Sequence, residues 1–162
     1  MTIHVQDYAH RLRNSIVERE LAGELRKMSE SERYQFIQEM MECGDAKCFA
    51  VGLWLAKSCL QERASFEGFL EGGLSRGDAS TVKYWIRAVI HSLGFRRVAR
   101  LVSKRVESDP ESVIKAEYWL RQLCPRDNLK ALEAIAVLQN EVRDIVERDP
   151  GIIDRVLSGG SL

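Results

Sequence analysis

Apolar residues recur along this chain at the spacing of amphipathic α-helices. In the clearest stretch, residues 81–94, they fall three or four positions apart and so form one stripe along a helix. The residues of this stripe are Val82, Trp85, Ile86, Val89, Ile90 and Leu93. No stretch alternates apolar and polar residues with the period of two that strands require. The pattern therefore predicts an all-α chain.

The three tryptophans suggest an internal repeat. Trp54, Trp85 and Trp119 are 31 and 34 residues apart, and each stands within a stripe of aliphatic residues. This spacing predicts that all three occupy the same step of a repeat and lie in the core, where a large ring buries much apolar surface. The alternative is that nucleic-acid bases stack on them in a groove. Tyr84 and Tyr118 stand one step off their stripes and are expected to be partly exposed.

Capping signals divide the stripes into helix pairs. Ser29 and Glu32 have the spacing of a capping box, and Asp109 followed by Pro110 predicts an N-cap and the first helical residue. Gly72 and Gly73 are expected to loosen the end of an earlier helix. We predict a single domain over residues 1–162, with units at about 1–44, 45–77, 78–108 and 109–149 and a cap at 150–162. Amphipathic helix pairs of this length are typical of solenoids.

The run that begins at Asp78 resembles the short HEAT-like repeats, of the type also found in phycobilin-lyase-like proteins. It has an aspartate start, a Val82-Lys83 step, a first helix ending in Leu93-Gly94, and a second helix before the next aspartate start at Asp109. The resemblance covers about residues 45–147. It implies a right-handed α-α superhelix, a HEAT-like solenoid of about four helix pairs plus a C-terminal cap. The second helices of such folds line a concave surface that binds proteins, peptides or sometimes nucleic acid.

Composition narrows the function classes. The 162 residues include 24 basic and 24 acidic side chains, so no overall charge favours nucleic acid or anionic membranes. Cys43, Cys48, Cys59 and Cys124 form no C-x-x-C motif, and His4, His10 and His91 lack ligand spacing, so we expect neither a metal nor a cofactor. No segment reads as a signal peptide or a membrane span, which leads us to expect a cytoplasmic protein without membrane contact.

One region is locally basic. Between Asp78 and Glu107 the chain has no acidic residue, but it has seven basic ones: Lys83, Arg87, Arg96, Arg97, Arg100, Lys104 and Arg105. Four of these (Arg96, Arg97, Arg100 and Lys104) share an arc of about 100° on the predicted second helix and are called the basic stripe below. One interpretation is a surface for an acidic peptide or a phosphate backbone. The other is pairing within the chain with the acidic residues that follow, Glu107, Asp109, Glu111 and Glu117.

The chain has no recognisable catalytic motif, such as a glycine-rich phosphate loop, a nucleophile elbow or a zinc-binding helix. His91 alone gives no basis for acid–base catalysis. We therefore expect a non-catalytic adaptor that binds another protein with an acidic surface through a basic, concave helix face formed by these residues. The alternative is a nucleic-acid-binding protein or an enzyme similar to the HEAT-like DNA glycosylases, using the same groove. Exposed Met40, Met41, Ile152 and Ile153 at the solenoid ends are expected to permit a homodimer.

Overall fold

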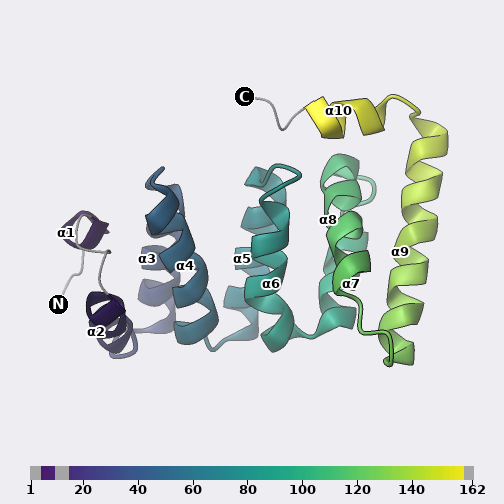
Figure 1. Cartoon of the computed structure of the whole chain (residues 1–162). Helices are drawn as coiled ribbons and strands as arrows, with labels where there is room; N and C mark the ends of the chain where they lie inside the picture. Colours follow the sequence, from purple (N-terminus) through teal and green to yellow (C-terminus); the bar gives the residue numbers. More distant parts are fainter. Residues whose placement is uncertain (1–4, 10–14, 159–162) are drawn as a thin grey trace. The chain divides into compact units, whose positions relative to one another are not determined.

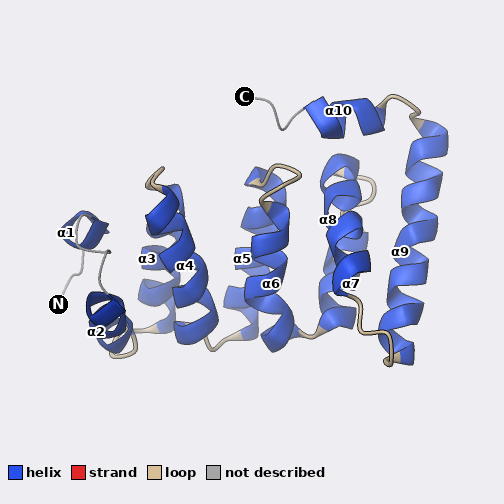
Figure 2. Cartoon of the chain, viewed as in Figure 1, coloured by secondary structure: helices blue, strands red, loops and turns tan. Residues whose placement is uncertain are grey.

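Every regular element in the part of the chain that the structure describes is a helix. The computed structural model describes residues 5–9 and 15–158 (Figure 1) and contains no strand within these ranges (Figure 2). The all-α prediction is confirmed. The helices are α1 (Val5–Ala9), α2 (Ser15–Leu25), α3 (Glu30–Glu42), α4 (Ala46–Cys59), α5 (Arg63–Arg76), α6 (Val82–Leu93), α7 (Phe95–Ser103), α8 (Pro110–Leu123), α9 (Leu129–Arg148) and α10 (Ile152–Ser158).

The predicted unit boundaries fall in loops, after α3, α5, α7 and α9. The segment 1–44 differs from a helix pair, because it holds α1, α2 and α3. Contacts within the chain divide it into two compact units, Met1–Phe69 and Leu70–Leu162. The single-domain organisation stays a prediction.

Side-chain caps explain where several helices begin. Ser29 Oγ accepts from the Glu32 N–H at 3.3 Å while the Glu32 carboxylate accepts from the Ser29 N–H at 2.8 Å, so the predicted capping box is confirmed. Asp45 Oδ1 accepts from the Lys47 N–H at 2.7 Å. Asp109 caps α8, with Pro110 at its first position, as predicted. Asn128 caps α9 by accepting from the Ala131 N–H at 3.1 Å.

In the Met1–Phe69 unit, α3 packs against α4, and α2 packs against the same helix. The fully buried side chains here include Leu21, Leu25, Ile37, Met40 and Leu55. Because Met40 is buried, it does not provide the exposed apolar end that was predicted for a homodimer.

In the Leu70–Leu162 unit, α8 packs against α6 and α7, α9 packs against α7 and α8, and α10 packs against α8. Gly94 alone connects α6 to α7. Its φ of 77° is a conformation that residues other than glycine rarely adopt. Ile152 is buried where α10 meets α8, which contradicts its predicted exposure, and Ile153 is half-buried.

Gly73 does not loosen α5, contrary to expectation, because the helix continues through Gly72 and Gly73 to Arg76. A Cβ atom at Gly73 would lie 2.6 Å from the Cβ of Trp85 and closer still to its indole ring. Glycine is therefore required for the close approach of α5 and α6, and Trp85 is buried there as predicted.

The other two tryptophans depart from the predicted core. Trp54 is 38% exposed and Trp119 is half-buried. Trp85 lies in the first turn of α6, whereas Trp54 and Trp119 lie in the third turn of α4 and α8, so the three do not occupy the same step of a repeat. Tyr84 and Tyr118 are exposed, as predicted.

Candidate partner-binding surface

Helix α7 and its C-cap residue, Lys104, carry the predicted basic stripe. Val98 and Val102 are buried, whereas Arg96, Arg100 and Lys104 are exposed and Arg97 is half-buried. Because successive residues of a helix are rotated by about 100°, the buried valines and the basic residues lie on different sides, as the apolar pattern predicted. The local geometry of the stripe therefore follows directly from the sequence of this helix.

The seven predicted residues do not all lie on one helix. Lys83, on α6, places its Nζ 4.8 Å from the centroid of the Tyr84 ring and 4.8 Å from that of the Trp119 ring, which are cation–π distances. Arg87 is exposed on the same helix. These two side chains lie on α6 and not on the helix that carries the stripe.

Arg105 is held inside the chain. Its Nη2 donates to Asp109 Oδ2 at 2.7 Å and to Ser75 Oγ at 2.8 Å, and its Nε donates to Ser112 Oγ at 3.2 Å. Burial by itself would raise the pKa of Asp109, but the hydrogen bonds from Arg105 and Ser112 outweigh it and hold that pKa below its ordinary value. Arg105 is thus engaged within the chain, which supports the second of the two interpretations for this residue.

Arg96, Arg100 and Lys104 of the stripe are not paired with the acidic residues that follow in sequence. Each of these carboxylates has another partner: Asp109 pairs with Arg105, Glu107 with Arg148 at 3.2 Å, Glu111 with Arg155 at 3.1 Å, and Glu117 with Arg121 at 3.8 Å. Within residues 5–9 and 15–158, no carboxylate forms an ion pair with Arg96, Arg100 or Lys104. The charges of these three residues are therefore available to a partner.

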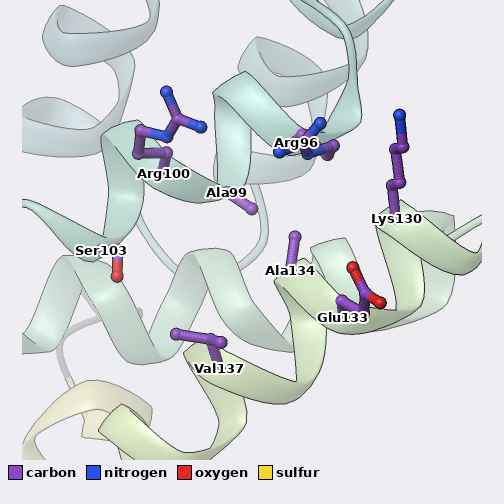
Figure 3. A pocket seen from close by; sticks show the side chains of 8 residues that line it. All are labelled: Arg96, Ala99, Arg100, Ser103, Lys130, Glu133, Ala134 and Val137. Atoms are coloured by element: carbon purple, nitrogen blue, oxygen red, sulfur yellow. The ribbon is translucent and has the colours of Figure 1, made fainter.

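A groove lies between α7 and α9, with a volume of about 260 Å³ (Figure 3). Arg96 and Arg100 project from α7 and Lys130 from α9, while the small side chains Ala99 and Ala134 lie between the two helices. Its remaining lining residues are Ser103, Glu133 and Val137. We call this the α7–α9 groove.

The groove combines positive charge with apolar surface. Three basic side chains and one carboxylate line it, a net charge of +2. Val137 is 56% exposed, although it is aliphatic. A second hollow of about 330 Å³ at the start of α7 shares Arg96 and Arg100 and adds Arg97. The two arginines thus face both hollows.

Sequence reasoning missed Lys130 and Val137. Both lie on α9, about thirty residues after the stripe, and only the packing of α9 against α7 brings them to it. Lys130 forms no ion pair in the described part of the chain. The one available signal was Val137 itself, an aliphatic residue off the buried stripe of α9.

The described residues hold no group of three or more His, Cys, Asp and Glu side chains that could bind a metal. Burial raises the pKa of the Cys48 thiol to about 12, and burial also raises the pKa values of Cys59 and Cys124. His91 is exposed, with its Nε2 3.0 Å from Ser92 Oγ; His4 and His10 lie outside the described residues. None of the helices between residues 5 and 158 combines the length and the apolar character that crossing a membrane requires.

Comparison with known proteins identifies no relative. No protein-family model matches the chain, and neither the curated proteins nor the solved structures contain a match. The resemblance to HEAT-like repeats therefore rests on the residues quoted above alone.

Proposed function

We propose that this chain is a non-catalytic adaptor that binds an acidic segment of another protein in the α7–α9 groove. The observation that carries the proposal is the state of Arg96, Arg100 and Lys130. All three are exposed and form no ion pair in the described chain, and the acidic residues that follow the stripe in sequence (Glu107, Asp109, Glu111 and Glu117) are paired with other arginines. Positive charges left unpaired along a groove favour a negatively charged partner.

The chemistry of the groove suggests what that partner presents. The guanidinium groups of Arg96 and Arg100 can each donate two parallel hydrogen bonds to one carboxylate. An exposed ion pair contributes only about 0–1 kcal/mol, so charge alone gives weak binding. Burial of the apolar surface of Val137 would add to it. The expected partner segment therefore carries acidic side chains next to at least one apolar side chain.

We also propose that the fold is a right-handed, HEAT-like α-α superhelix of about four helix pairs plus a C-terminal cap. In the Leu70–Leu162 unit, α8 packs on α6 and α9 packs on α7, so the first helices contact one another and so do the second helices. Successive repeats of a solenoid pack in this way. Such an arrangement would place the groove on the side formed by second helices.

The four cysteines are free thiols, the state expected in a reducing compartment, and a cytoplasmic location is part of the proposal.

Nucleic-acid binding, or a base-acting enzyme similar to the HEAT-like DNA glycosylases, is the alternative at the same site. The unpaired arginines could equally neutralise phosphates. The lining of the α7–α9 groove contains a carboxylate, Glu133, but no aromatic ring on which a base could stack. This composition favours the protein partner.

A direct binding measurement separates the two. Fluorescence anisotropy would follow a short labelled peptide of glutamate and leucine, and a single-stranded oligonucleotide of equal charge, at low and high salt. The adaptor proposal expects tighter binding of the peptide with a shallow salt dependence. Tighter binding of the oligonucleotide, weakening steeply with salt, would contradict it.

A further inference from the structure

A cavity separate from the α7–α9 groove lies between α8 and α10. Its volume is about 470 Å³, within the range of about 300–1,000 Å³ usual for small-molecule sites. The walls are mainly aliphatic and aromatic: Ile114, Tyr118 and Trp119 from α8, and Ile153, Val156 and Leu157 from α10. The turn before α6, at Ala79 and Ser80, closes one side. We call this the α8–α10 pocket.

The walls of the pocket are fixed by specific contacts. Trp119 Nε1 donates to the Ala79 carbonyl oxygen at 2.7 Å, which ties α8 to the turn before α6. The Tyr118 ring stands edge-on to the Trp119 ring, with centroids 5.0 Å apart and planes at 82°. Arg155 Nε donates to Glu111 Oε1 at 3.1 Å, which ties α10 to α8. These contacts connect the walls of the pocket to one another.

The pocket leaves apolar surface in water. Leu157 is 68% exposed and Tyr118 is 48% exposed, although both line the same cavity. Covering this surface with an apolar ligand is favourable in proportion to the area removed from water.

The charge of the pocket is positive. Lys115 lines it, and Lys83 places its Nζ 4.8 Å from the centroid of the Trp119 ring. Neither lysine forms an ion pair in the described part of the chain, and no acidic side chain lines the pocket. The nearby carboxylate of Glu111 is engaged by Arg155. An anionic ligand therefore has the Lys115 ammonium group available and meets no repelling carboxylate in the lining.

We propose that the α8–α10 pocket binds a small amphipathic carboxylate, an aliphatic chain with one anionic end. The chain would lie against Ile114, Tyr118 and Leu157, and the carboxylate would accept hydrogen bonds from Lys115. The proposal does not depend on the function of the α7–α9 groove, since the two sites share no residue.

The test is isothermal titration of the full chain with octanoate, below its micelle concentration, and with 1-octanol as the uncharged analogue. We expect saturable binding of one octanoate. Leu157→Glu should abolish it, because this change removes an apolar wall and adds a repelling charge. Leu129→Glu is the matched control, because Leu129 is 70% exposed on α9, away from the pocket, and its variant should bind octanoate as the wild type does. Lys115→Gln should weaken octanoate binding about tenfold and leave octanol binding unchanged.

A second readout does not depend on the folding of any variant. In the wild type, octanoate should shift the indole N–H resonance of Trp119, which lines the pocket, and leave that of buried Trp85 unchanged. Absence of octanoate binding, equal affinity in Leu157→Glu, or equal affinity for octanol and octanoate would overturn the proposal. So would a titration that leaves the Trp119 resonance unmoved.

Discussion

Arg105 Nη2 lies 2.7 Å from Asp109 Oδ2, one helical turn further along the chain. The pair joins the end of the basic segment to the N-cap of α8, since Asp109 Oδ1 also accepts from the Ser112 N–H at 3.2 Å. One carboxylate thus caps a helix and neutralises the last arginine of the segment. Arg105 therefore has a structural role, whereas Arg96 and Arg100 remain exposed.

Replacing Arg105 should therefore affect stability and spare partner binding. Arg105→Gln should lower the free energy of unfolding by about 1–3 kcal/mol, because Asp109 loses a charged hydrogen-bond donor. Arg87→Gln is the control, since Arg87 is exposed on α6 and forms no ion pair in the described chain; it should change stability by less than about 0.5 kcal/mol. Urea unfolding measures both. Equal effects would contradict the structural role of Arg105.

The lowered pKa of Asp109 predicts a pH dependence. A carboxyl group whose pKa is lower in the folded state contributes stability above its ordinary pKa of about 3.9, and this contribution is lost as the pH falls through the folded value. Asp109→Asn should therefore cost most stability near neutral pH, and the difference from the wild type should shrink at about pH 3. Urea unfolding at both values tests this. A difference that stays constant with pH would show that the ionised carboxylate does not matter.

The tryptophans should differ sharply in their contribution to stability. Trp85→Ala should lower the free energy of unfolding by about 3–5 kcal/mol, because it empties a buried site between α5 and α6. Trp54→Ala should cost less than half as much, since its ring is 38% exposed. Denaturant unfolding of the two variants compares them directly. Similar losses would mean that Trp54 is also a core residue.

Two glycines within helices provide a matched test of close packing. Gly73→Ala should destabilise the chain by about 1–3 kcal/mol, because the new methyl group would overlap the Trp85 side chain. Gly23→Ala, in α2, meets no atom within 4 Å and should stabilise the chain by up to about 1 kcal/mol through the higher helix propensity of alanine. Thermal unfolding reports both signs. A neutral Gly73→Ala variant would contradict the close approach of α5 and α6.

Local signals in the sequence predicted local structure well. The apolar stripe of residues 81–94 became α6, and the caps at Ser29 and Asp109 lie where their side-chain chemistry requires them. These features depend on residues within one or two turns of each other. The same holds for the separation of Val98 and Val102 from Arg96 and Arg100 on α7.

Features set by packing between helices were not predictable from periodicity. Trp54 lies in a helical stripe like that of Trp85, yet its ring is exposed, because burial depends on which helix covers that turn. Gly73 looked like a helix end because its role depends on a side chain in the next helix, Trp85. Lys130 reaches the candidate site only through the contact of α9 with α7, which the sequence does not encode at short range.

The most direct test of the adaptor account is a pull-down from nuclease-treated lysate of the source cells. It would compare the wild type with Arg96→Glu/Arg100→Glu, which reverses the charge of the groove, and with Arg63→Glu/Arg126→Glu, which makes the same charge change at two exposed arginines outside it. We expect a discrete protein partner that the wild type and the control retain and the groove variant loses. A partner retained equally by all three proteins would contradict the α7–α9 groove as the site of an acidic protein. So would a parallel pull-down without nuclease that recovers nucleic acid alone.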